Sequence, residues 1–242
     1  KIQGVLLAWQ AGMEGGLATA DILCGDVNPS GKLTDTFAGC FDDYPSSANF
    51  NESEDYVEYK EDIYVGYRYF ETIPGAAKKV NYPFGYGLSY TTFDKKVVQV
   101  QEKEEAICVT VLVTNMGNCE GKEVVQLYYG APQGVLGKPA KELGAFAKTR
   151  TLGCGDSQML CLTLPIKDMA SYDDLGKIAK SAYVLEKGSY HFWLGGSVRE
   201  AEKIEYTYEV AENQVVEQLQ SKCAPTQLKE RLLSDGTYEM LP

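Results

Sequence analysis

The sequence is poor in the residues that build metal centres. It contains one histidine, His191, and its seven cysteines include no Cys-x-x-Cys pair. A structural zinc site takes about four ligands from His and Cys, usually at close and regular spacing. We therefore expect no metal site in this chain, and no motif of the sequence implies a cofactor.

The sequence also lacks long apolar runs and an excess of basic residues. Its longest apolar runs, such as Gly4 to Trp9 and Val109 to Val113, fall far short of the roughly 20 residues that cross a bilayer. Lys and Arg number 23 against 34 Asp and Glu, which gives a formal net charge of -11. Because phosphate groups attract clustered Lys and Arg, this charge argues against nucleic acid and anionic membranes as partners.

The start of the chain shows no signal-peptide pattern, since Lys1 is followed only by a short apolar run that ends at Trp9. The cysteines are odd in number and widely spaced: Cys24, Cys40, Cys108, Cys119, Cys154, Cys161 and Cys223. A chain of this size does not depend on disulfides for stability. The cysteine usage favours a reducing compartment, and we expect a cytoplasmic location.

The residues 1–92 predict part of an α/β unit. Gly4 to Trp9 is a short continuous apolar run, the pattern of a strand that is buried on both faces. A helix is expected to follow, with Glu14 at its start, where an anion is favoured, and Gly25 as its C-terminal stop. A short strand is expected over 32–37.

The stretch 38–62 is polar and predicts a long loop, with six acidic residues between Glu52 and Asp62. Its carboxylates lack the alternating spacing and the central Gly of a calcium loop, so we interpret the stretch as a solvated loop. Arg68 follows among tyrosines, and we expect it to form either a cation-π contact with them or a buried ion pair with Glu61 or Asp62.

From Phe93 onward the apolar residues recur with a period of two. Ile107, Val109, Val111 and Val113 alternate with Cys108, Thr110, Leu112 and Thr114, and the pattern returns around 124–129, 160–164, 190–194 and 204–210. Five or more such segments separated by turns favour an antiparallel β-sandwich over 93–210, although periodicity alone leaves a barrel open.

The residues 211–242 change character again. Val215, Val216 and Leu219 are spaced as in a helix, and Leu228 with Leu232 begins a second short helical pattern. These residues offer little apolar surface of their own. We interpret them as a connector that wraps the sandwich or leads into another domain.

Several motifs together carry a family resemblance. They are Met13-Glu14-Gly15-Gly16, then Gly25-Asp26-Val27-Asn28-Pro29-Ser30-Gly31-Lys32-Leu33, the block 61–70, and Tyr82-Pro83-Phe84-Gly85-Tyr86-Gly87-Leu88-Ser89-Tyr90. Gly121 to Tyr128 and Pro139 to Phe146 continue the series. In this order they resemble glycoside hydrolase family 3, whose members include β-glucosidases and β-xylosidases.

The resemblance implies a mainly β chain with an α/β part. It implies the C-terminal portion of an α/β sandwich domain over 1–92, an antiparallel fibronectin type III-like β-sandwich over 93–210, and a connector over 211–242. The parent protein would be a retaining β-glycosidase that hydrolyses terminal β-linked sugars. Its partners would be the carbohydrate substrate and the remaining parts of the same enzyme, and a homo-oligomer is left open.

Two departures from the family pattern matter for function. In the family the acid/base Glu lies well before the Glu-Gly-Gly block, but only twelve residues precede Met13 here and none is Glu. The barrel domain with the nucleophilic Asp is not in this sequence either. We therefore expect no catalytic residue in this chain, with Glu14 as a weak substrate-binding candidate, and a permuted domain order in which the barrel follows residue 242.

The predicted function is thus a non-catalytic scaffold portion of a β-glucosidase-like hydrolase, inactive alone. Two alternatives stay open at this point. One is a carbohydrate-binding or adhesion module built on the sandwich. The other is an interaction scaffold whose incomplete α/β part needs a partner chain.

Overall fold

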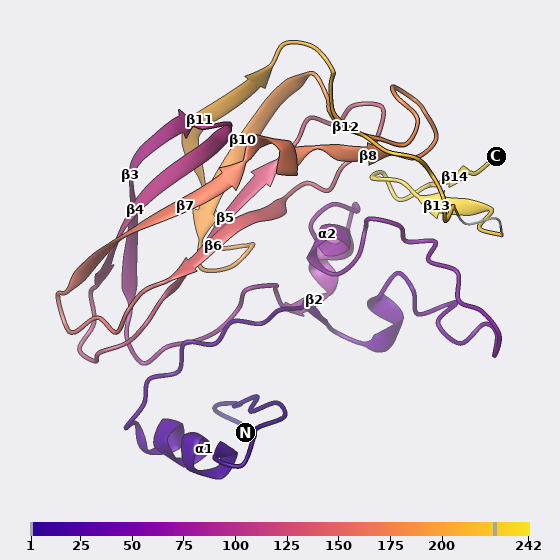
Figure 1. Cartoon of the computed structure of the whole chain (residues 1–242). Helices are drawn as coiled ribbons and strands as arrows, with labels where there is room; N and C mark the ends of the chain where they lie inside the picture. The colour runs from indigo at the N-terminus through magenta and orange to yellow at the C-terminus, as the bar shows by residue number, and fades with distance from the viewer. Residues whose placement is uncertain (1, 225–226) are drawn as a thin grey trace.

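The computed structural model describes residues 2–224 and 227–242, and its main body is a two-layer β-sandwich (Figure 1). One layer is a four-stranded sheet in the order β11-β10-β5-β6, and the other is a three-stranded sheet in the order β3-β4-β7. A smaller sheet, β12-β9-β8, continues from the sandwich. Neighbouring strands are antiparallel throughout, so the prediction of an antiparallel sandwich is confirmed.

The strands of these three sheets account for most of residues 93–218. They are β3 (Phe93–Lys103), β4 (Ala106–Asn115), β5 (Val124–Gly130), β6 (Glu142–Lys148), β7 (Ser157–Pro165), β8 (Ser171–Asp173), β9 (Ala182–Leu185), β10 (Gly188–Gly195), β11 (Glu202–Val210) and β12 (Gln214–Gln218). A 3₁₀ turn over Ile166–Met169 links β7 to β8.

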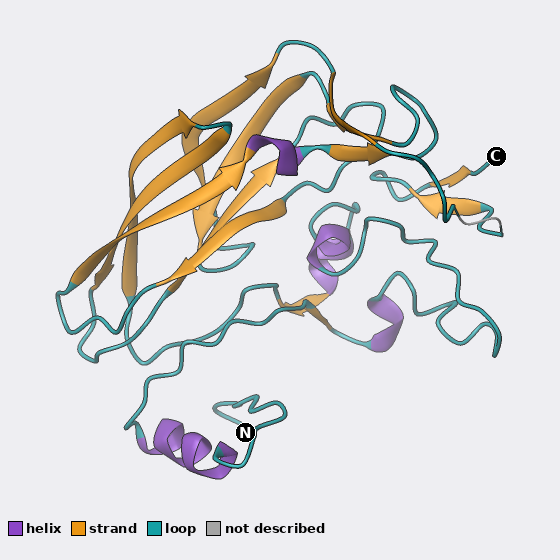
Figure 2. Cartoon of the chain, in the orientation of Figure 1, coloured by secondary structure: helices purple, strands orange, loops and turns teal. Residues whose placement is uncertain are grey.

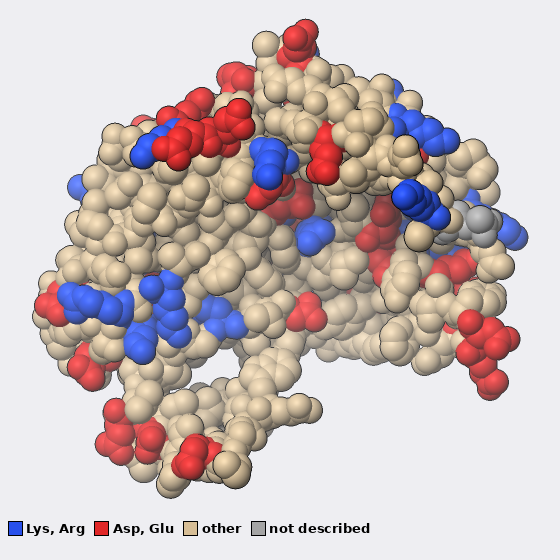
Figure 3. Space-filling model, viewed as in Figure 1, with Lys and Arg blue, Asp and Glu red and all other residues tan. Residues whose placement is uncertain are grey.

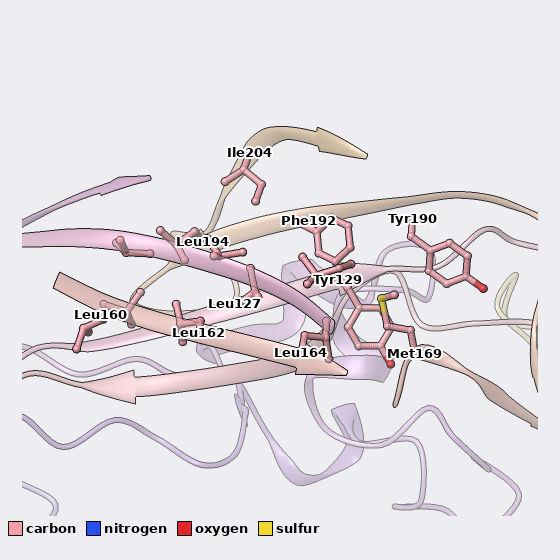
Figure 4. Close-up of a cluster of buried hydrophobic side chains, with 14 of the residues drawn as sticks. Leu127, Tyr129, Leu160, Leu162, Leu164, Met169, Tyr190, Phe192, Leu194 and Ile204 are labelled. Carbon is pink, nitrogen blue, oxygen red and sulfur yellow. The ribbon is translucent and has the colours of Figure 1, made fainter. Parts of the chain in front are cut away.

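The core of the sandwich comes from the inward faces of the two main sheets (Figure 4). On β4, Val109, Val111 and Val113 are fully buried while the residues between them are partly exposed. Across the layers they meet side chains such as Leu127 and Phe192, which are also fully buried. Burial of each such side chain contributes about 1.5–3 kcal/mol, which explains why the period of two is so clear in this part of the sequence.

The residues before β3 contain little regular structure (Figure 2). The expected helix is present as α1 (Gly15–Cys24), and Gly25 ends it in the left-handed conformation with φ of 86°. The other elements are short: β1 (Phe37–Ala38), α2 (Tyr67–Phe70), β2 (Val80–Tyr82), and 3₁₀ turns over Phe41–Asp43 and Ala76–Lys79. β1 pairs with β2, and of the strand expected over 32–37 only Phe37 lies in a strand. The polar stretch 38–62 is largely loop, as predicted.

The predicted strand from Gly4 to Trp9 is wrong. The segment has no regular structure, and Val5 and Trp9 are each 71% exposed. A strand buried on both faces needs neighbours in a sheet, and no described residue pairs with this segment. Trp9 therefore contacts only the edge of Phe37, with ring centroids 6.4 Å apart, rather than ending a buried strand.

The helices predicted after residue 211 are also wrong. β12 pairs with β9, and β13 (Glu230–Leu232) and β14 (Tyr238–Met240) form a hairpin. The register of β12 shifts between Val215 and Glu217, which lets two adjacent apolar residues lie in one strand. The free edge of β9 supplies the hydrogen bonds that make residues 214–218 a strand. The spacing of the apolar residues within 215–219 does not reveal that edge.

A buried ion pair fixes the loop between β5 and β6. The side chains of Lys138 and Glu186 are 1% and 5% exposed, and the Lys138 ammonium donates to the Glu186 carboxylate. The same carboxylate accepts from the backbone N–H groups of Val135 at 2.8 Å and Leu136 at 3.4 Å. Because the carboxylate has three donors, its burial is compensated and the loop wraps around it.

A second carboxylate holds the loop between β8 and β9. Asp173 is 1% exposed and accepts hydrogen bonds from the backbone N–H groups of residues 176–179, at distances between 2.6 and 3.0 Å. Burial alone would raise its pKa, but the four donated hydrogen bonds outweigh burial and lower the pKa of Asp173.

This lowered pKa predicts a pH-dependent contribution to stability. Above pH about 3.9 the unfolded carboxyl is charged too and the contribution is complete, and it is lost as the pH falls toward the native pKa. Asp173→Asn should therefore lower the melting temperature at pH 7, with a smaller difference from wild type at pH about 3. Thermal unfolding followed by circular dichroism at both pH values checks this. An equal difference at the two pH values would contradict the assigned role of the charge.

Candidate functional site

The structure places Glu14 immediately before α1. It is the N-cap residue, yet its side chain makes no capping hydrogen bond, and α1 has no buried residue. Glu14 is itself exposed. The helix start is confirmed, while a role for Glu14 in substrate binding stays a prediction.

Two hollows of the structure lie on the sandwich, away from Glu14. One, of about 580 Å³, lies between β3 and β11 and includes Lys95, Lys203 and Tyr206. The other, of about 510 Å³, lies where β3, β4 and β7 end and includes Cys108 and Cys161. Both are open at the surface. Glu202 and Glu205 of β11 line the first, and Glu104 is the one carboxylate that lines the second.

Within residues 2–224 and 227–242 no group of three or more His, Cys, Asp or Glu side chains is arranged to hold a metal ion. Over the same residues no helix is long and apolar enough to cross a membrane. Acidic and basic side chains are interspersed on the face that Figure 3 shows.

The motif residues instead meet one another at a junction between the N-terminal segment and the sandwich. Asn28 accepts hydrogen bonds from the Ser89 hydroxyl and the Tyr90 N–H, both at 2.9 Å, and donates to the Glu120 carbonyl at 2.9 Å. Leu33 and its partners 85–86 exchange two backbone hydrogen bonds of 2.8 Å. Asn28 therefore joins three separate parts of the chain.

An ion pair with limited exposure lies at the same junction. The Lys32 ammonium lies 3.2 Å from the Glu123 carboxylate and donates to the Gly87 carbonyl at 3.1 Å. Lys95 approaches the other oxygen of Glu123 at 3.4 Å. The side chains of Lys32 and Glu123 are 14% and 10% exposed, so the pair is shielded from water. It joins the Gly-Lys-Leu motif to the first residues before β5.

The junction also contains a close backbone approach. A Cβ atom on Gly87 would lie 2.1 Å from the Gly31 carbonyl oxygen and 3.1 Å from Lys32 Cδ. No side chain fits there. This contact explains physically why the second of these motifs contains glycine at position 87.

An aromatic cluster extends the junction on the face of the β5 sheet that points away from the sandwich core. Tyr67 of α2 packs against Phe84, with ring centroids 4.5 Å apart, and edge-on against Tyr128 at 6.2 Å. The Tyr67 hydroxyl accepts a hydrogen bond from Leu143 N–H at 2.9 Å. Trp193 borders the cluster, and the Lys141 ammonium lies 5.2 Å from the centre of its ring. Burial lowers the pKa of Lys141 and raises that of Tyr128.

Of the two contacts expected for Arg68, the cation-π contact is present: its guanidinium lies 6.0 Å from the centre of the Tyr67 ring. Its charge also acts on Glu142, where burial raises the pKa and Arg68 partly offsets that rise. The expected ion pair with Asp62 does not form, because Asp62 pairs with a residue far away in the sequence, Arg231.

The N-terminal segment leaves its apolar side chains uncovered. It projects from the sandwich (Figures 1 and 3). More than half of each of these side chains is exposed: Ile2, Val5, Trp9, Met13, Leu17 and Leu23. Contiguous apolar surface of this kind marks an interaction site in a folded protein. The junction can hold this segment against the sandwich, and the segment has an apolar face free for another partner.

Family models match two parts of the chain. Residues 1–90 match the glycosyl hydrolase family 3 C-terminal domain, and residues 123–198 match the fibronectin type III-like domain. The two matches meet at the junction described above, since Lys32 lies in the first and Glu123 in the second.

Known proteins of similar sequence and structure are β-glucosidases. β-Glucosidase A of Butyrivibrio fibrisolvens is 59% identical over all of this chain, and a β-glucosidase of Ruminococcus albus is 42% identical over 98% of it. A solved β-glucosidase of Paenibacillus barengoltzii superposes on 96% of the chain with a TM-score of 0.89 and 54% identity. β-Glucosidase 3B of Thermotoga neapolitana superposes on 86% with a TM-score of 0.76 and 42% identity.

The chain spans only part of each of these proteins. It covers 31% and 25% of the two relatives by sequence, and 26% and 28% of the two solved chains. The motifs, the two family models and the agreement in fold lead to one assignment. The chain belongs to glycoside hydrolase family 3, and it contains the closing part of that family's C-terminal domain together with the fibronectin type III-like domain.

Proposed function

We propose that this chain is the non-catalytic scaffold of a retaining β-glycosidase of the β-glucosidase type, which hydrolyses terminal β-linked sugars. The observation that carries the proposal is the junction. There the family motifs bind the sandwich through Asn28, the Lys32–Glu123 pair and Tyr67, and they line neither of the two hollows described above. Their role in this chain is to hold two structural parts together.

The catalytic groups are assigned to the rest of the parent enzyme. Retaining hydrolysis needs two carboxyl groups about 5–5.5 Å apart, one as nucleophile and one as acid and base. The resemblance gives this chain neither of them. The names of the relatives support β-glucosidase as the activity class of the whole protein, and their greater length supports a missing remainder.

We propose that the remainder of the α/β domain covers the exposed N-terminal face. Burial of apolar surface stabilises a protein by roughly 25 cal/mol per Å². Side chains such as Val5, Leu17 and Leu23 are more than half exposed here, so most of their apolar surface contributes no such stabilisation in the isolated chain. The missing sheet would also supply neighbours for residues 4–9. This partner accounts for a segment whose sequence predicts a strand that does not form here.

Two finer points stay proposals. A permuted order, with the barrel after residue 242, fits a hairpin that continues beyond the sandwich. A reducing, cytoplasmic location fits the seven free cysteines. The parent gene and the localisation of its product test them separately.

The scaffold role predicts that Glu14 is dispensable for catalysis. Glu14→Gln in the full-length parent should change kcat/KM on an aryl β-glucoside by less than about threefold, because Glu14 contacts no functional group in this chain. Loss of a general acid or base costs about 10²–10⁴-fold. A steady-state assay of the purified variant distinguishes the two cases, and a hundredfold loss would return Glu14 to the active site.

A further inference from the structure

The last two strands form a hairpin that is too small to be stable alone. β13 and β14 pair over three residues each. In the turn between them, Asp235 accepts hydrogen bonds from the Thr237 N–H at 2.9 Å and the Thr237 hydroxyl at 2.7 Å. An isolated two-stranded hairpin is marginally stable in water at best. The hairpin therefore depends on the parts of the chain that it contacts.

Its first contact is with the acidic loop that precedes α2. Leu232 is 4% exposed, and its N–H donates to the Lys60 carbonyl at 2.7 Å. The Lys60 ammonium lies 3.2 Å from the Glu58 carboxylate and 3.5 Å from that of Glu230. One strand of the hairpin is thus bound to the loop by a backbone hydrogen bond and a shared ammonium.

Its second contact joins that loop to the sandwich through Arg231. This guanidinium lies 2.9 Å from Asp174, 3.1 Å from Glu239 and 3.6 Å from Asp62. Lys177 also binds Glu239, at 2.7 Å. Asp62 belongs to the acidic loop, Asp174 follows β8 of the sandwich, and Glu239 belongs to the hairpin itself. The Arg231 side chain is only 13% exposed.

We propose that the hairpin, residues 229–241, is a clasp that fastens the acidic loop 58–62 to the β8–β9 loop of the sandwich, with Arg231 as the positioning residue. A single exposed ion pair would not support this, because such pairs contribute little. Here carboxylates of three segments share one partly buried guanidinium. The backbone hydrogen bond from the next residue, Leu232, to Lys60 also holds the strand against the loop. The inference rests on these contacts alone and does not depend on the proposed glycosidase role.

Amide hydrogen exchange of the whole chain tests the clasp. The Asp62 N–H donates to the Tyr59 carbonyl at 3.2 Å and the Tyr64 N–H to the Glu61 carbonyl at 2.9 Å, so both amides report on the loop. Arg231→Gln should speed their exchange roughly tenfold, as expected for loss of a charge-assisted hydrogen bond. Asp174→Asn should have a similar effect, because it removes the charge on the sandwich side that the Arg231 guanidinium binds.

The control is Arg150→Gln, which removes an exposed pair with Asp156 at 3.6 Å and should leave both amides unchanged. Exchange of the β4 amides reports whether a variant is still folded. If Arg231→Gln does not fold, Asp174→Asn decides alone. Unchanged exchange at residues 62 and 64 in Asp174→Asn overturns the clasp, because the hairpin would then hold the loop without linking it to the sandwich.

Discussion

Glu186→Ala should lower the free energy of unfolding by about 3–5 kcal/mol, the cost of breaking a buried ion pair from one side. The Lys138 ammonium would stay buried without its carboxylate, and the N–H groups of Val135 and Leu136 would lose their acceptor. Since small domains are stable by only about 5–15 kcal/mol, much of the chain would be unfolded in mild denaturant. Urea unfolding followed by circular dichroism measures the change.

Two further variants separate charge from packing. Glu212→Ala removes an exposed carboxylate and should change stability by less than about 0.5 kcal/mol. Lys138→Met combined with Glu186→Leu replaces the pair by apolar groups of similar size and should recover much of the loss. A loss below about 1 kcal/mol in Glu186→Ala would show that the loop does not depend on this pair.

The sequence predicted the features that depend on residues close together in the chain. It did not predict those that depend on contacts between distant residues. The alternation of Val109, Val111 and Val113 predicts β4 because each residue's face follows from its neighbours. Lys138 and Glu186 are 48 residues apart, and neither position carries a sign of the other. Local patterns gave the sandwich, and long-range pairs that no pattern records fix its loops.

The two failed predictions also depend on residues that are distant in the sequence. The spacing of Val215, Val216 and Leu219 fits a helix, but the edge of β9 offers backbone partners and a strand forms. The apolar run from Gly4 to Trp9 fits a buried strand, but its sheet neighbours are not among the described residues. Propensity is a weak guide where a distant partner, present or absent, decides the outcome.

Gly87→Ala should separate the N-terminal segment from the sandwich. The added Cβ would lie 2.1 Å from the Gly31 carbonyl oxygen, so the backbone around 31–33 must move. Overpacking of this kind costs about 1–3 kcal/mol, and the displaced segment would also lose the Lys32–Glu123 pair. Hydrogen exchange at Leu33, whose N–H donates to the Tyr86 carbonyl at 2.8 Å, should become faster while the amides of β4 keep their protection.

Gly31→Ala is the matched control, because a Cβ on Gly31 meets no atom within 4 Å. It should leave the Leu33 amide protected. Equal effects of the two substitutions would show that the close approach at Gly87 is not what holds the segment.

The junction itself was partly visible in the sequence. Asn28, Lys32 and Gly87 all lie in the motifs that carry the family resemblance, although spacing alone did not show that these motifs bind one another. Glu123 and Tyr67 lie in later motif blocks, so membership in a block was the available signal. Their contacts with residues far away in the sequence, such as Lys32 with Glu123, became apparent only in the folded chain.

The most direct test of the central claim is an assay of the purified chain on an aryl β-glucoside. We expect no release of the aryl alcohol above buffer at any pH between about 4 and 8, because we assign the two carboxyls that retaining hydrolysis requires to the rest of the parent. Full-length parent assayed in parallel should turn over the same substrate. Turnover by the chain alone, abolished by replacing one of its own carboxylates, would contradict the scaffold role.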